Sequence, residues 1–549
     1  MFKKSSGKLV LNKSDWVDYL IIPFIFLLLL IPFSILKNAY IWDDLSFINN
    51  KVFSDNKSFF EVITNLFWQN SSHKDYSEFQ PLFRPVTSLL LWIEGKLFNN
   101  WLPGFHLVSV LLGFLIGFLV ANISSVLMKI KSPGFYFFII SLVVLHPLNA
   151  EIISLAVNIS DYLALIFLLI SLKLNLEYLQ NKRGRVSLII YSLMLFFATA
   201  SKEFAVLGLL IPLLSISILK AVNIESSYTL LKDKFLLIAS LFPVLLFLIL
   251  RWLVIADGSF DKIDFSIFFN SIIFLLPLLL FRIFAPVPSG AHIYIGSSNY
   301  MWIAAFVIIS FLMIFTAWRA YKNRVSLPLW AILSIAAVII VLPSFLAAAK
   351  IGDQIVIPVR YFFAGLPFVI IGLIPILNRF WQVTFYKILM VIAIALFSML
   401  FFIRAGEWES SLKFSRAEAV YHPDAFYEND NYIKMLINME HYDEAMHEVE
   451  KMQTSSLFNN NKVKAQVYFY KARILGDHFK NMNTALVEIE RAIELNPSNL
   501  QYIYEYAFLL LKSNDEYKAL QILNDALSSN YFNNSQKDEI KKKIKFIKR

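Results

Sequence analysis

Two adjacent aspartates, Asp43 and Asp44, stand in the stretch NAYIWDDLSFINN, directly after an apolar run at 18–37. A carboxylate held where a membrane helix ends can take a proton from a hydroxyl group, and so act as a general base. Ionisable side chains near bilayer depth are costly, so they point to function unless they pair. A pair of carboxylates that merely faces water is the alternative interpretation.

Further charged and polar side chains follow the later apolar runs on the same side of the membrane as the two aspartates. Several cations on one face could hold the phosphate of a lipid-phosphate sugar as the leaving group, while its long chain lies between helices. Snorkelling to the interface is the alternative for Lys202, Glu203 and Arg251, and a satisfied core histidine is the alternative for His106. The candidates for substrate and lipid-phosphate binding are Arg84, His106, His146, Glu151, Asp161, Lys202, Glu203, Arg251, His292, Tyr294, Arg360 and Tyr361.

The elements that position these residues are membrane helices. Hydrophobic residues make up 58% of the 549-residue chain and charged residues only 16%, which is far from the composition of soluble domains. Lysines before the first run place the N-terminus in the cytoplasm, and the predicted inner loops carry the Lys and Arg excess. A run at 265–283 would break this alternation, so we interpret it as re-entrant or interfacial on the outer side. Eleven crossings are predicted, at 18–37, 105–128, 135–156, 160–178, 186–200, 203–220, 235–255, 300–318, 327–349, 360–377 and 385–404.

The net charge of +10 does not point to nucleic acid, because the basic residues lie mostly in short loops between apolar runs. The chain has no cysteine, which excludes disulfides, thiolate metal sites and thiol nucleophiles. His73, Asp75 and Glu78 offer an imidazole and two carboxylates, but their spacing is not that of a metal site and favours a solvated loop. We assign no metal site, and a divalent cation remains a possible cofactor.

Composition changes at about residue 405, where a charged segment follows the last apolar run. We therefore predict two domains, 1–404 in the membrane, with a first outer loop at 38–104, and 405–549 on the outer side. Ala485 and Ala519 lie 34 residues apart, as do Ala492 and Ala526, which is the period of tetratricopeptide repeats. The alternative is an irregular helical cap. The terminal stretch QKDEIKKKIKFIKR is typical of a basic amphipathic helix end with a solvated capping face.

The ordered set WDD, FRP, GFHLV, HPLNAE, NISDYLA, SKE and RYFF, closed by these repeats, resembles the transmembrane and tetratricopeptide-repeat O-mannosyltransferase family and its bacterial relatives. The resemblance implies an all-α fold, a GT-C type bundle followed by a tetratricopeptide-repeat solenoid. It also implies that Asp43, with Asp44 beside it, is the base or acceptor-orienting carboxylate. Lys202, Glu203 and Arg360 would then help to form the phosphate and sugar site.

We accordingly expect an inverting membrane glycosyltransferase that moves a sugar from a polyprenyl-phosphate donor to a protein hydroxyl, with the acceptor bound by the repeats. An enzyme that modifies a lipid or cell-surface glycan and a non-catalytic scaffold or transporter are the alternatives. We expect membrane lipids but no nucleic acid as further partners. The expected location is a bacterial inner membrane, with the N-terminus cytoplasmic and the repeats outside the cytoplasm.

Overall fold

The computed structural model describes most of the chain, in ranges that leave several segments out. Asp43 and the group His73, Asp75 and Glu78 lie outside these ranges. The chain divides into two compact units, Met1–Ser411 and Leu412–Arg549, which we call unit 1 and unit 2. The described residues are 13–41, 44, 57–67, 82–99, 101–130, 132–224, 233–255, 277–286, 290–295, 300–323, 327–343, 349–351 and 354–548.

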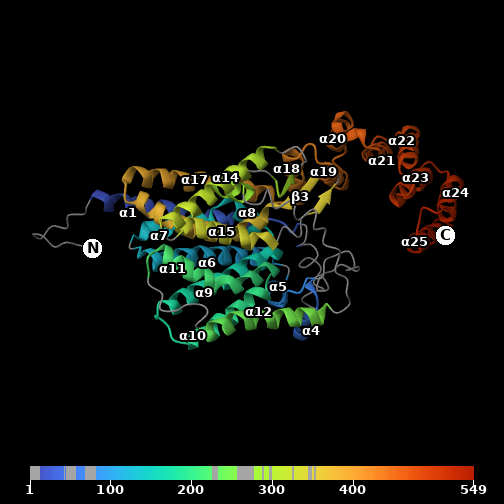
Figure 1. Ribbon diagram of the computed structural model, residues 1–549. Coiled ribbons are helices and arrows are strands. Elements are labelled where there is room, and N and C mark those ends of the chain that lie inside the picture. Colours follow the sequence, from blue (N-terminus) through green and yellow to red (C-terminus); the bar gives the residue numbers. More distant parts are fainter. Residues whose placement is uncertain are drawn as a thin grey trace, which may run out of the picture. The chain divides into compact units, whose positions relative to one another are not determined.

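Unit 1 is built almost entirely from helices, and Figure 1 shows α6, α9 and α11 running side by side within it. A further helical stretch covers 277–284. The helices are α1 (Lys13–Leu28), η1 (Ile31–Lys37), α4 (Phe59–Thr64), α5 (Pro85–Phe98), α6 (Leu102–Met128), α7 (Pro133–Val144), α8 (Pro147–Ser154), η3 (Ala156–Asn158), α9 (Ile159–Leu179), α10 (Val186–Thr199), η4 (Glu203–Leu210), α11 (Ile211–Ala221), α12 (Lys234–Val254), α14 (Tyr300–Lys322), α15 (Leu329–Val341), η6 (Val359–Gly365), α16 (Leu366–Trp381) and α17 (Thr384–Glu407).

The protein is a multi-pass membrane protein. Each of the eleven predicted runs is helical over most of its length. Among the described residues, seven helices are long and apolar enough to cross a membrane, or eight if one bent pair counts as a single span. Three more apolar helices are shorter, at Val186–Thr199, Val307–Ala320 and Leu329–Val341. Of the predicted re-entrant run at 265–283, only 277–283 is described, and it is helical.

Two glycines on α6 let neighbouring helices approach closely. A methyl group at Gly117 would lie 3.1 Å from a methyl of Val144 and 3.2 Å from the carbonyl oxygen of Ile140, both on α7. A methyl group at Gly113, one turn earlier, would lie 3.4 Å from the Tyr162 hydroxyl of α9. Small residues four apart are a common contact surface between membrane helices, where close packing replaces the hydrophobic driving force. Gly113 and Gly117 therefore let α9 and α7 pack closely against α6.

The bent pair is α7 and α8, whose axes differ by 59°. Pro147 begins α8 and cannot donate a backbone hydrogen bond to the preceding turn, which ends α7 at this point. His146 caps the new helix, because its Nδ1 accepts a hydrogen bond from the backbone N–H of Leu148 at 3.2 Å. The break thus holds α8 at an angle among the membrane helices.

The sequence analysis did not anticipate a small sheet in unit 1. It consists of β1 (His292–Ile295), β2 (Ala349–Ile351) and β3 (Gln354–Pro358), in the order β1-β3-β2 with both pairings antiparallel. His292 pairs with Pro358, and η6 follows directly after β3. The sheet therefore fixes where η6 starts, and with it Arg360 and Tyr361.

Unit 2 consists of helices that pack in consecutive pairs, α19 with α20, α21 with α22 and α23 with α24. The predicted alanines are buried in equivalent places, with Ala485 and Ala492 on α22 and Ala519 and Ala526 on α24. The elements are α18 (Ser411–Tyr421), α19 (Phe426–Asn438), α20 (Tyr442–Thr454), η7 (Ser456–Asn459), α21 (Asn461–Asp477), α22 (Met482–Leu495), α23 (Leu500–Lys512), α24 (Glu516–Ser528) and α25 (Asn534–Ile547).

Candidate functional site

Asp161 and Lys202 form a buried ion pair. Asp161 lies in the first turn of α9, and Lys202 lies in the turn between α10 and η4. The Lys202 Nζ donates to Asp161 Oδ2 at 2.5 Å, and the two side chains are 10% and 3% exposed. The partial positive charge at the start of a helix further favours a carboxylate at this position. Two residues that are 41 positions apart in the sequence thus meet where α9 begins.

A second ion pair joins Arg84 to Glu203, the residue after Lys202. Arg84 Nε lies 3.0 and 3.1 Å from the two Glu203 oxygens, and Nη2 lies 2.7 Å from Oε2. Two parallel donors on a carboxylate fix its orientation as well as its charge. Arg251, near the end of α12, adds a third cation 3.8 Å from Glu203 Oε1.

Arg360 and Tyr361 reach the same place from η6. The Lys202 Nζ and the Arg360 guanidinium carbon each stand 5.6 Å from the centre of the Tyr361 ring, within the range of cation–π attraction. The charge cluster, as we name it, comprises Arg84, Asp161, Lys202, Glu203, Arg251 and Arg360. Its four cations accompany two carboxylates, and Glu151, whose charge acts with that of Arg360, adds a third carboxylate beside them. This concentration of cations suits an anionic ligand such as a phosphate.

An apolar cavity of about 300 Å³ lies beside η4. The same helix that begins with Glu203 of the charge cluster contributes Leu207 and Leu210 to the cavity wall. The other walls come from α9, α11, α15 and α16, and the lining is almost entirely aliphatic. One short helix therefore connects a cationic region with an apolar one.

The Asp44 carboxylate accepts hydrogen bonds from two backbone N–H groups. Its Oδ2 accepts from the backbone N–H of Ala156 at 3.1 Å and its Oδ1 from that of Val157 at 2.9 Å. These groups open η3, so the carboxylate caps the start of a helix. This geometry favours a positioning role for Asp44, and the role of base remains a prediction for Asp43.

Glu94 and Tyr40 lie close enough to this carboxylate for its charge to act on them, and His106 is a further polar residue that is buried. Glu94 of α5 is 2% exposed, and its oxygens make no hydrogen bond in the part of the chain that the structure describes; the same holds for the Tyr40 hydroxyl and for His106 Nδ1. The other ring nitrogen of His106 lies 3.2 Å from the Asn38 carbonyl oxygen, so His106 is a buried core histidine in this structure. Burial and then the negative charge of Asp44 raise the pKa of Glu94 to about 8, and the same causes raise that of Tyr40.

The wild-type protein is expected to lose stability as the pH rises from about 4.5 to about 8, and Glu94→Gln is expected to remove this loss. A carboxyl whose pKa is higher in the folded than in the unfolded chain stabilises the fold while both states are protonated, and this stability is lost as pH rises through the folded pKa near 8. Thermal unfolding of the detergent-purified protein across this range measures the effect. Glu450→Gln on the exposed face of α20 is the control, and an unchanged profile in Glu94→Gln would contradict the prediction.

Among the remaining candidates, Glu151 adjoins the charge cluster, since its charge acts with that of Arg360. His146 uses both ring nitrogens, since Nε2 lies 3.0 Å from the Ile283 carbonyl oxygen and Nδ1 caps α8, so neither is available to a phosphate. Glu151 is buried on α8, 4.0 Å from an Arg404 nitrogen. His292 and Tyr294 are two apart on β1, with ring centres 6.5 Å apart.

Sequence reasoning missed four charged residues near these candidates. Arg404 of α17 pairs with Glu407 and contacts Glu151, and Arg282 is buried close enough for its charge to act with those of Arg404 and Glu151. Glu94 is the fourth. Each stands within or beside an apolar stretch, and an isolated charge there was the available signal.

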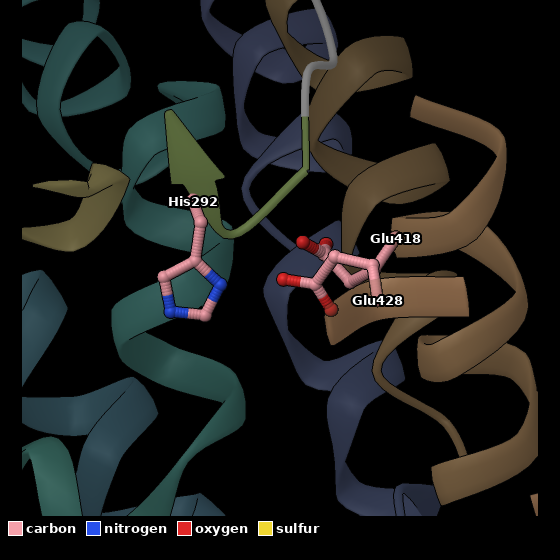
Figure 2. Close-up of side chains that lie close together, drawn as sticks. All are labelled: His292, Glu418 and Glu428. Carbon is pink, nitrogen blue, oxygen red and sulfur yellow. The ribbon is translucent and has the colours of Figure 1, made fainter. Parts of the chain in front are cut away.

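Two further carboxylates meet in unit 2. Glu418 of α18 and Glu428 of α19 are 0% and 1% exposed. Their oxygens lie within 4.8 Å of one another, and Figure 2 shows both side chains turned toward the same space. Two buried carboxylates at this separation can bind a divalent cation or share a proton. The possible divalent cation stays a prediction.

No family model matches the sequence, and no curated protein matches it. One similar solved structure is an oligosaccharyltransferase of Archaeoglobus fulgidus, tethered to an acceptor peptide that contains the NVT sequon. The two chains are 15% identical with a TM-score of 0.31, and the match covers 78% of this chain but only 59% of that one. This chain thus spans less than two thirds of that protein's length, and the functional proposal rests on the residues and contacts described above.

Proposed function

We propose that this protein is a membrane glycosyltransferase of the GT-C type that moves a sugar from a polyprenyl-phosphate donor to a protein hydroxyl. One observation carries the proposal. The charge cluster, which holds more cations than carboxylates, stands at the start of η4, and the rest of η4 lines an apolar cavity. An amphiphilic anion with a long apolar chain fits this combination of regions.

In the proposed reaction a carboxylate, for which we favour Asp43, takes the proton of the acceptor hydroxyl. The hydroxyl oxygen bonds to the anomeric carbon of the sugar while the bond from that carbon to the phosphate oxygen breaks. The leaving phosphate keeps the bonding electrons, and Lys202 with Arg84 and Arg360 stabilises its charge. A single displacement inverts the configuration at this carbon and needs no second carboxylate nucleophile.

The proposed acceptor is a protein segment bound by unit 2, which we interpret as tetratricopeptide repeats. Stacked helix pairs of this kind present an extended concave surface. We propose that this unit lies outside the cytoplasm of a bacterial cell. The loops with the Lys and Arg excess are on the cytoplasmic side of the membrane, and unit 2 follows the last span on the opposite side. A lipid or surface glycan as acceptor is the second candidate, and a non-catalytic scaffold is the third.

Glycan mass spectrometry of envelope proteins and lipids, with and without the gene, tests the proposal. We expect one protein-linked sugar to disappear on deletion, to return with the wild-type gene and to stay absent with Asp43→Asn at equal membrane levels. Loss of a lipid-linked or surface glycan instead would identify the second candidate. Unchanged glycans throughout, or full transfer by both Asp43→Asn and Asp44→Asn, would overturn the enzyme assignment.

Filling the apolar cavity is expected to impair use of long-chain donors. Ala336 of α15 lines the cavity, and Ala336→Phe would occupy part of the volume in which the polyprenyl chain is proposed to lie. We expect about tenfold weaker apparent affinity for a long-chain donor, equivalent to about 1.4 kcal/mol, with little change for a short-chain analogue. Kinetic comparison of the two donors measures this. Equal impairment with both donors would contradict the role of the cavity.

A further inference from the structure

The last helix of unit 2, α25, has an apolar stripe that already has a partner. Ile540 is fully buried, and Ile544 and Ile547 are partly buried against the core of the same unit. A capping box at Asn533 and Gln536 fixes where the helix begins. The stripe expected from the sequence therefore serves the fold of unit 2, and any further role must belong to the opposite face.

That opposite face is strongly basic. Five lysines follow Glu539 without an intervening acidic residue, and all five are exposed. Lys541 pairs with Asp538 at 2.9 Å, and the Lys543 ammonium stands 5.7 Å from the Tyr504 ring. The lysines are Lys541, Lys542, Lys543, Lys545 and Lys548.

One large apolar side chain stands among these lysines. Phe546 is 79% exposed, and Lys542 and Lys543 lie four and three residues before it, hence beside it on the helix surface. A solvated capping face accounts for the lysines but leaves the exposed ring unexplained. Burying such a ring in an apolar layer is favourable.

We propose that this face of α25 binds the anionic headgroups of a lipid bilayer, with the Phe546 ring inserted at the boundary of the acyl chains. Lysines near an anionic membrane surface are attracted to it, and aromatic side chains between lysines are typical of helices that lie in the interface. RNA would also satisfy the lysines, and its bases can stack on an aromatic ring, so an oligonucleotide is the competing ligand in the test. Unit 1 of the same chain spans a membrane, so unit 2 is tethered to a bilayer by the chain itself. The proposal is independent of any transferase activity.

The absence of cysteine allows a clean labelling experiment on the full-length protein. Phe546→Cys, labelled with an aromatic environment-sensitive fluorophore, is reconstituted in nanodiscs of phosphatidylcholine with or without phosphatidylglycerol. We expect the anionic lipid to shift the emission to the blue and to lower quenching by acrylamide severalfold. Gln521→Cys on the exposed face of α24 is the control and should respond equally in both lipids.

A second variant separates charge from the label. Replacing Lys542, Lys543, Lys545 and Lys548 by glutamine keeps the buried isoleucines, so the helix remains packed, and should abolish the difference between the two lipids. Equal quenching in both lipids, or a difference that survives the four substitutions, would overturn the proposal. A comparable shift on adding an oligonucleotide to neutral nanodiscs would indicate a general polyanion site and would overturn it as well.

Discussion

Glu203→Gln is expected to destabilise the protein by about 3 kcal/mol, because it leaves the Arg84 guanidinium without its bidentate partner. The Arg84 and Glu203 side chains are only 14% and 27% exposed, so water compensates little of the loss. Arg251, 3.8 Å from the same carboxylate, adds repulsion once the negative charge is gone. Thermal or denaturant unfolding in detergent, followed by tryptophan fluorescence, measures the change.

The double variant Arg84→Met with Glu203→Met tests the physical reason. Replacing both members of a buried pair by apolar side chains removes the unpaired charge, and is often nearly neutral. The double variant should therefore be more stable than Glu203→Gln alone. Lys451→Gln is a matched control, since its pair with Glu448 is at the surface and half-exposed, and should cost under about 1 kcal/mol. A Glu203→Gln protein as stable as wild type would show that the pair is not important for the fold.

The apolar runs predicted the helices of unit 1 well, because a segment that crosses a bilayer must be apolar and must satisfy its own backbone. The start of α8 also follows from local sequence, since Pro147 has no backbone donor. The sheet of β1, β2 and β3 has no such local signal. Its strands are three to five residues long, and the pairing of β1 with β3 joins segments that are far apart in the sequence.

Part of the charge cluster was anticipated because its members stand beside apolar runs on one predicted side. The sequence did not predict which of these residues pair. Asp161 meets Lys202 and Arg84 meets Glu203 only through the packing of α5, α9 and η4. Asp44 shows best what the sequence alone does not predict about the site. Its acidity suggested chemistry, but the decisive fact is the pair of backbone N–H groups at the start of η3, which no sequence pattern reveals.

Lys202→Met is expected to lower the rate of sugar transfer by about 100-fold, because removing one preorganised donor to a developing anion typically costs this much. Lys202 is the cation of the charge cluster closest to the start of η4, one residue before the helix whose other end lines the cavity. Under the proposed function it therefore contacts the phosphate that leaves. Single-turnover kinetics with a purified donor measures the rate of the chemical step.

The substitution also leaves Asp161 buried without its partner 2.5 Å away, so loss of folding must be separated from loss of chemistry. The double variant Lys202→Met with Asp161→Asn removes both charges, and should recover stability but not transfer. Lys173→Met, which breaks a partly exposed pair with Glu177 on the same α9 helix, should change neither. If the double variant regained transfer together with stability, Lys202 would be a structural partner of Asp161, and the anion site would have to lie elsewhere.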